Sequence, residues 1–237
     1  MDDATNVVWV FPAIGHSANE EAQNYGHPAH RGFAEAIGAD PVVFPDVSIG
    51  ALRGTLAEPA IASWQFDIPG ADIYILENPA STYAAPFIRR SSPDATIIQL
   101  AADLEFFGLQ SYTFQDDPFP KRVVRWADRR TNSAFISYLL KHYIDGVIAV
   151  SELMQDAIRD MMPKGPIEIV HPYVQPDMAD RLDALSTPEF GSHRVLTVCE
   201  GREHKGVDLL AEAWPTVREE IPDASLSIVG DGHPDRY

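Results

Sequence analysis

Cysteine and lysine are both scarce in this 237-residue sequence. The single cysteine, Cys199, cannot form an intramolecular disulfide, which favours a reducing compartment and predicts a cytoplasmic protein. Only 4 of the 18 basic residues are lysines, whereas acidic residues number 35 and the net charge is -17. A general nucleic-acid binder is excluded, because neutralising phosphates needs a surplus of Lys and Arg.

Long hydrophobic runs are also missing. No apolar stretch approaches the roughly 18 residues that a membrane-spanning helix needs, and the opening Met1-Asp2-Asp3 is unlike a signal peptide. The sequence therefore predicts a soluble protein. An acid surplus with so little lysine favours a halophilic protein, since high salt screens self-repulsion. The alternative is an ordinary acidic cytoplasmic protein.

Strand-like apolar runs alternate with helix-length segments along the whole chain. Such runs suit strands that are buried on both faces of a parallel sheet. We expect strands at Val7–Phe11, Pro41–Phe44, Ala71–Leu76, Thr96–Ala101, Gly146–Val150, Ile167–Val170, Arg194–Cys199 and Ser225–Val229. The longest expected helix is Arg122–Tyr143. Repeated strand–helix alternation predicts an α/β fold with a doubly wound, Rossmann-like parallel sheet.

The domain organisation follows from a composition change near the end. Residues 1–183 form the first expected domain, polar residues 184–192 form a linker, and residues 193–237 start a second unit. Typical domains have about 100–150 residues, so two strands and one helix bury too little surface to stand alone. Either this unit extends the first sheet, or the chain is the front part of a longer two-domain protein. We expect the second.

The strongest local signal for ligand binding lies in the second unit. A loop containing Arg202 and Lys205 precedes a helix that begins near Val207, and Gly230 and Gly232 follow the last strand. Free N–H groups at a helix N-terminus, together with basic side chains, suit a diphosphate. The glycines would let the backbone approach a ligand closely. Alternatively, the glycines only make tight turns and the basic pair is solvated.

This region resembles the nucleotide-binding half of the retaining, family-4 group of GT-B glycosyltransferases. The matching segments are Gly201-Arg202, Lys205–Leu210, Ala213-Trp214, Pro222-Asp223 and Leu226–Gly232, with Asp145–Ser151 and Ile167–Tyr173 upstream. The resemblance implies a GT-B N-terminal domain followed by the first βαβ unit of a second Rossmann-like domain. It also implies transfer of a hexose from a nucleotide-diphosphate sugar to a hydroxyl of a glycan or lipid-linked acceptor, with retained configuration and without a cofactor.

The resemblance assigns donor-side roles residue by residue. Arg202 and Lys205 match the basic pair that holds the donor diphosphate, where they would stabilise charge developing on the leaving group. Gly15 lies in the loop after the first strand, where the family has glycines beside the phosphates; here one glycine is followed by His16. The family's paired acidic motif lies beyond residue 237, so this chain alone is expected to be inactive.

The acceptor side departs from the family pattern. Family members often have a His in the loop after the strand that corresponds to Ala71–Leu76, whereas here that loop is Glu77-Asn78-Pro79-Ala80. Glu77 is a candidate acid/base group in that place, and a surface carboxylate is the alternative. His16 is a second candidate, as a substrate contact beside the cleft between domains.

Two further groups of residues are candidates with competing explanations. Asp103 and Glu105 follow a strand and could contact an acceptor hydroxyl, or they could simply favour a helix dipole. Arg122, Arg125 and Arg129 share one face of the longest expected helix. That face could rest on anionic lipid as a peripheral membrane contact, hold a phosphate-bearing acceptor, or pair with surface carboxylates.

A metal site is not expected. Three histidines and two glutamates fall in one polar segment, but their spacing matches no compact ligand pattern; they are His16, Glu20, Glu21, His27 and His30. Two other functions remain open at this point. The chain could be a non-catalytic GT-B fragment or binding protein, or a GT-B-like sugar-nucleotide epimerase.

Overall fold

The structure, a computed structural model, describes residues 5–12, 28–45, 57–102, 119–162, 164–172, 174, 176–185, 192–198 and 206–230. At positions 12, 28–29, 119–126 and 128–129 it describes the backbone alone. The chain forms two compact units, Met1–Asp180 and Arg181–Tyr237. Each unit is described by itself.

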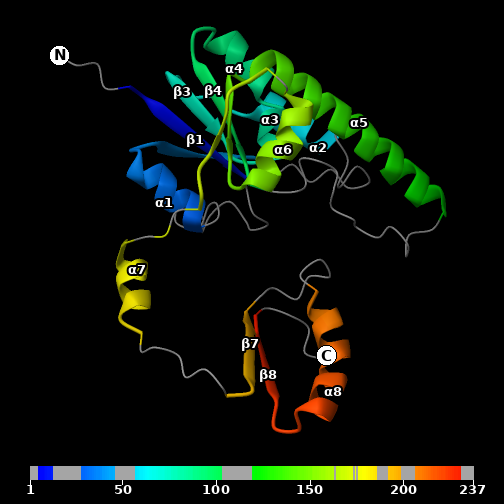
Figure 1. Ribbon diagram of the computed structural model, residues 1–237. Helices are drawn as coiled ribbons and strands as arrows, with labels where there is room; N and C mark the ends of the chain where they lie inside the picture. Colours follow the sequence, from blue (N-terminus) through cyan, green and yellow to red (C-terminus); the bar gives the residue numbers. More distant parts are fainter. Residues whose placement is uncertain are drawn as a thin grey trace. The chain divides into compact units, whose positions relative to one another are not determined.

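The first unit is built on a six-stranded parallel sheet (Figure 1). In chain order its strands are β1 (Val7–Pro12), β2 (Asp40–Phe44), β3 (Ile73–Leu76), β4 (Thr96–Ala101), β5 (Gly146–Ala149) and β6 (Ile167–Ile169). Their order across the sheet is β2-β1-β3-β4-β5-β6, and every neighbouring pair is parallel. The predicted doubly wound parallel sheet is therefore confirmed.

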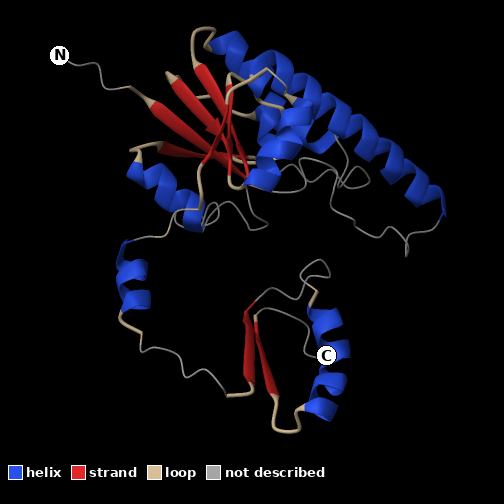
Figure 2. Ribbon diagram, viewed as in Figure 1, coloured by secondary structure: helices blue, strands red, loops and turns tan. Residues whose placement is uncertain are grey.

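Helices cover both faces of this sheet, so the unit has three layers (Figure 2). The described helices are α1 (Pro28–Ala36), α2 (Ala57–Gln65), α3 (Pro79–Thr82), α4 (Ala85–Ser91), α5 (Phe119–Tyr143), α6 (Glu152–Met161) and α7 (Pro176–Asp183), which contains the boundary between the units. Helices α2 to α6 lie over one face, and α1 lies over the other. Among the described helices, none is both long and apolar enough to span a bilayer.

The alternation of side chains along β1 divides the core between the two faces. Val8 and Val10 join the larger cluster under α2 to α6, whereas Trp9 and Phe11 pack with α1 on the opposite face. Successive side chains of a strand point to opposite faces, so a strand that is apolar throughout must be covered on both. All four side chains are at most 2% exposed.

Arg89 donates hydrogen bonds to several segments at the amino-terminal edge of this sheet. Its guanidinium donates to the carbonyl oxygens of Pro93, Ala95 and Tyr143, at 3.0, 2.6 and 3.2 Å, and to the Asp145 carboxylate at 2.7 Å. Because Asp145 also accepts from the Ile97 N–H at 2.8 Å, one side chain of α4 links the start of β4 to the end of α5.

Replacing Arg89 by methionine should lower the free energy of unfolding of the first unit by roughly 2–3 kcal/mol, because the substitution leaves several carbonyls and one carboxylate without their donor. Urea denaturation measures the change. Arg90→Met is the matched control, since Arg90 is the exposed neighbour on the same helix and should change the value by less than about 0.5 kcal/mol. Equal effects of the two substitutions would contradict the linking role of Arg89.

The second unit contains two parallel strands and one helix: β7 (Arg194–Val198), α8 (Val207–Glu220) and β8 (Ser225–Val229). Helix α8 begins after Gly206, whose φ of 70° lies in the left-handed region. Residues with a Cβ rarely adopt this conformation, so the backbone at position 206 explains why a glycine follows Lys205 in the sequence. The predicted βαβ unit is present.

His193 and Asp223 join the starts of β7 and β8. The His193 ring is 2.8 Å from one Asp223 carboxylate oxygen and 2.9 Å from the other. The resemblance gave Pro222-Asp223 only as a family motif, and this contact supplies a structural role for it. The hydrogen bond from His193 lowers the pKa of the Asp223 carboxyl below its ordinary value.

A lowered carboxyl pKa means that the interaction stabilises the folded unit above the ordinary pKa of Asp and is lost as the pH falls through the lowered one. NMR titration of the Asp223 carboxyl should therefore give a midpoint below its ordinary value. In a His193→Gln variant the midpoint should return towards the ordinary value. An unshifted midpoint in the unsubstituted protein would show that the contact is not made in solution.

Candidate active site

The carboxyl ends of the strands in the first unit form the edge where a site is expected. The order in which strands are added to the sheet reverses between β1 and β3. β2 pairs with one side of β1, whereas β3 pairs with its other side and β4 to β6 continue from β3. In open α/β sheets, ligands bind beyond the carboxyl ends of the strands at such a switch point. Glu77 directly follows β3, and its N–H donates to the Val10 carbonyl of β1 at 3.1 Å. Glu77 thus lies at the switch point.

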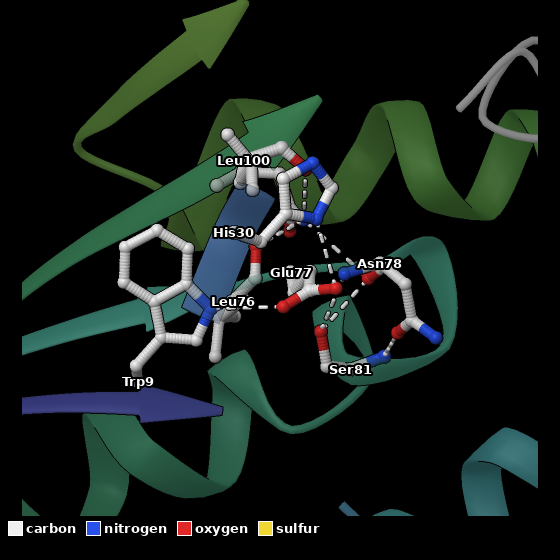
Figure 3. Close-up of polar contacts among 8 residues, drawn as sticks. Trp9, His30, Leu76, Glu77, Asn78, Ser81 and Leu100 are labelled. Carbon is white, nitrogen blue, oxygen red and sulfur yellow. Dashed lines mark hydrogen bonds and ion pairs between the residues drawn. The ribbon is translucent and has the colours of Figure 1, made fainter. Parts of the chain in front are cut away.

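The Glu77 carboxylate is buried and accepts two hydrogen bonds from side chains (Figure 3). Its Oε2 accepts from the Trp9 indole N–H at 3.0 Å, and its Oε1 lies 3.0 Å from His30 Nδ1. The Glu77 side chain is 6% exposed and that of His30 is 17% exposed. The alternative that Glu77 is a surface carboxylate is therefore wrong: β1 and α1 enclose it, and both of its oxygens have partners.

The loop after β3 is held by a helix cap. The Asn78 side chain accepts from the Ser81 N–H at 2.7 Å, and the Ser81 hydroxyl in turn accepts from the Asn78 N–H at 3.2 Å. Together these two bonds form a capping box at the start of α3, and Pro79 occupies its first turn. The cap fixes the direction in which the chain leaves β3, and so the position of Glu77.

A buried amide supports the same loop from β4. Gln99 is fully buried; its Nε2 donates to the Leu76 carbonyl at 2.7 Å, and its Oε1 accepts from the Thr82 hydroxyl at 2.8 Å. The same nitrogen is within 3.2 Å of the Leu100 carbonyl and 3.4 Å of the Asn78 carbonyl. Gln99 therefore connects β4 to the residues on both sides of Glu77.

The arrangement suits proton transfer at the edge of the sheet. A carboxylate bonded to one ring nitrogen fixes the orientation of an imidazole and stabilises its protonated form. The pair combines a carboxylate and an imidazole, the two side-chain types that most often act as general acids and bases. Among the described residues, no cluster of three or more His, Cys, Asp or Glu side chains could hold a metal ion.

The other sequence-predicted residues are only in part within the described structure. Gly230 directly follows β8. The backbones of Arg122, Arg125 and Arg129 belong to α5, and their side chains are outside the described set. The remaining candidates lie outside the described residues: Gly15, His16, Asp103, Glu105, Arg202, Lys205 and Gly232.

Three residues of the site were missed by the sequence reasoning. His30 was considered only with the other histidines of its segment, and Trp9 and Gln99 only as parts of strands. A usable signal was present, because His30 lies in the first turn of α1 and Gln99 is the one amide in β4, where apolar residues flank it. The contact between His30 and Glu77 joins residues 47 positions apart, and it exists because β1 and β3 are neighbours.

No family model matches the chain, and no curated protein matches it in sequence. Among solved structures, sucrose-phosphate synthase from Thermosynechococcus elongatus aligns with a TM-score of 0.55 at 15% identity, covering 99% of this chain and 64% of that protein. MnaA from S. aureus, solved with UDP, aligns with a TM-score of 0.49 at 13% identity, covering 98% and 64%. TarM aligns with a TM-score of 0.47 at 17% identity, covering 69% and 28%.

These structures are longer than the chain, which spans between 28% and 64% of their lengths. The alignment with sucrose-phosphate synthase reaches a TM-score of 0.55 over nearly the whole chain, and at 15% identity it bears on the fold alone. The chain is therefore an α/β protein whose first unit is a Rossmann-like parallel sheet, consistent with the N-terminal domain of a GT-B protein.

Proposed function

We propose that this protein is a GT-B glycosyltransferase that transfers a hexose from a nucleotide-diphosphate sugar to a hydroxyl of a glycan or lipid acceptor, with retained anomeric configuration. The observation that carries the proposal is the buried Glu77–His30 pair at the switch point of a Rossmann-like sheet. Glu77 lies in the loop after β3, where the sequence resemblance places a group beside the reacting sugar, and His30 contacts it from α1. The similarity in fold to sucrose-phosphate synthase supports the same architecture.

In this proposal the Glu77–His30 pair acts on the acceptor. The acceptor O–H bond breaks, and its oxygen forms a bond to C1 of the sugar on the same face from which the diphosphate leaves, as retention of configuration requires. The bond between C1 and the phosphate oxygen breaks, and its electron pair goes to the diphosphate. His30 takes up the acceptor proton, and Glu77 stabilises the imidazolium that results. Arg202 and Lys205, with the glycines at positions 15, 230 and 232, would hold the departing diphosphate.

The proposal is tested on the protein expressed from its complete reading frame. UDP-, GDP- and ADP-hexoses are each incubated with glycan and lipid-linked acceptors, and release of nucleoside diphosphate is measured. Release that depends on the acceptor, with a product of unchanged anomeric configuration by NMR, is the expected result. Interconversion of the donor without an acceptor would instead identify an epimerase. Binding of a nucleotide sugar without either reaction would identify a binding protein.

A further inference from the structure

An open pocket lies at the amino-terminal edge of the sheet in the first unit. Its walls come from the end of α5, the residue before β5 and the turn between α6 and β6. Because all strands of the sheet are parallel, this edge is opposite the one that carries Glu77. The pocket has a volume of about 540 Å³. Small-molecule sites span about 300–1,000 Å³, so the pocket has room for a ligand.

Two ammonium groups set the charge of this pocket. Lys141 and Lys164 both line it, and the whole sequence has only four lysines. Among the described residues, neither ammonium has a hydrogen-bond or ion-pair partner. The one carboxylate of the described lining, Asp145, already accepts from Arg89 at 2.7 Å and from the Ile97 N–H at 2.8 Å. The pocket is therefore locally positive in a chain whose net charge is -17.

The competing explanation is that these lysines only compensate the carbonyl groups at the ends of α5 and α6, where cations are favourable. Arginines already serve that purpose. Arg89 donates to the Tyr143 carbonyl at 3.2 Å, and Arg159 donates to the Gly165 carbonyl at 2.9 Å. Compensation of the helix ends therefore accounts for the arginines better than for the two lysines.

The buried part of the pocket lining is apolar. Ile144 is 5% exposed and Met162 is 6% exposed, and the Pro166 ring extends this surface outwards. Gly165 allows the Met162 side chain to lie against the backbone of the turn, because a Cβ at position 165 would come within 2.8 Å of Met162 Cγ. An apolar group that covers Ile144 and Met162 would gain from burial. The exposed lysines and the apolar base together favour a ligand with one anionic end and one apolar end.

We propose that this pocket binds a phosphate monoester carried on an apolar group. A phosphate monoester has a charge of about -1.5 to -2 near neutral pH, which two ammonium groups match. Lysine binds phosphate as a point charge, without the paired geometry that arginine requires. The apolar group of the ester lies over Ile144 and Met162. This site is separate from the Glu77–His30 pair, and it does not depend on the proposed transfer reaction.

Binding is tested on the full chain with methyl-labelled methionine. The Met162 methyl resonance, identified with a Met162→Leu variant, is followed by NMR while phenyl phosphate, inorganic phosphate and phenol are titrated separately. We expect a saturable shift with phenyl phosphate, and a dissociation constant at least about fivefold lower than for either fragment. The local probe separates this pocket from a phosphate site near Arg202 and Lys205. No saturable shift, or equal affinity for a fragment and the ester, overturns the inference.

Matched substitutions locate the phosphate group. Lys141→Gln and Lys164→Gln should each raise the dissociation constant of phenyl phosphate about three- to tenfold, because each removes one ammonium but keeps a polar side chain. Arg130→Gln is the control, since it removes the same charge from an exposed position on α5 that lies about three turns, or roughly 16 Å, before Lys141. It should change the constant less than about twofold. Equal effects of Lys141→Gln and Arg130→Gln would indicate a general charge effect and overturn the inference.

Vesicles distinguish a lipid headgroup from a soluble phosphate ester. Phosphatidylcholine vesicles with and without phosphatidic acid, whose headgroup is a phosphate monoester, are floated with the full chain. Flotation that requires phosphatidic acid and is lost in the Lys141→Gln, Lys164→Gln double variant supports the inference with a lipid as the ligand. Binding of phenyl phosphate without such flotation, or with flotation that the double variant retains, supports it with a soluble ester as the ligand.

Discussion

Replacing Gln99 by leucine should lower the free energy of unfolding of the first unit by about 2–4 kcal/mol. Gln99 is fully buried, and its amide is the hydrogen-bond partner of the Leu76 carbonyl and the Thr82 hydroxyl. Leucine has a similar volume but no polar atoms, so it removes the side-chain donor of the Leu76 carbonyl and leaves the Thr82 hydroxyl with only the Asn78 carbonyl, at 3.3 Å. Native-state hydrogen exchange of the β4 amides measures the change within the first unit.

Gln155→Leu is the matched control for this prediction. Gln155 is half-buried on α6 and makes one hydrogen bond through its side chain, to the Ile167 carbonyl at 3.1 Å. The same substitution there should cost about 0.5–1.5 kcal/mol. A Thr82→Val, Gln99→Leu double-mutant cycle isolates the contact between the two side chains, and its interaction energy should exceed about 0.5 kcal/mol. Fully additive effects would show that the buried network does not act as a unit.

The sheet could be predicted from the sequence because its strands are buried on both faces. Val7–Phe11 is apolar throughout, and the structure places its alternate residues in the two core clusters. The long helix α5 was expected to begin at Arg122 and begins at Phe119. An apolar pattern of this strength is a property of the segment itself. It therefore predicts a strand or a helix without knowledge of which strands and helices pack beside it.

Short helices were not predicted, because their signals are local and weak. Helix α3 has four residues and depends on the Asn78–Ser81 capping box, while α4 follows almost at once at Ala85. Helix α7 begins at Pro176, a residue type that in a sequence alone can equally mark a break between elements. Proline is common in the first turn of a helix, where its missing N–H costs nothing, so the same residue supports either interpretation.

The site could be predicted only in part. Glu77 was identified because it begins the loop, after the predicted strand Ala71–Leu76, in which members of the resembled family often have a His. Its burial and its partners depend on β3 lying beside β1, and strand order is not contained in the apolar pattern. A carboxylate in a loop is usually solvated. Trp9 and His30 reverse that expectation here by enclosing Glu77 and donating to both of its oxygens.

Replacing Glu77 by glutamine should lower kcat/KM of the proposed transfer by about 100- to 10,000-fold, the usual contribution of a general acid–base group. Glutamine keeps the shape of the side chain but removes the charge that stabilises a protonated His30. The measurement is the initial rate of nucleoside diphosphate release at saturating donor and subsaturating acceptor, normalised to the folded fraction by circular dichroism. Glu168→Gln, at an exposed position on β6, is the control and should stay within about twofold.

Proton transfer by the Glu77–His30 pair also predicts how the effects of substitutions at the two residues combine. If Glu77 works by orienting and stabilising His30, then His30→Gln should cost a similar factor, and the double variant should lose little more than either single one. Independent roles would instead multiply the two losses. A purely structural role would lower the folded fraction while leaving the rate per folded molecule near that of the unsubstituted protein. Non-additive losses in rate, with the folded fraction preserved, would therefore support the chemistry proposed for this edge of the sheet.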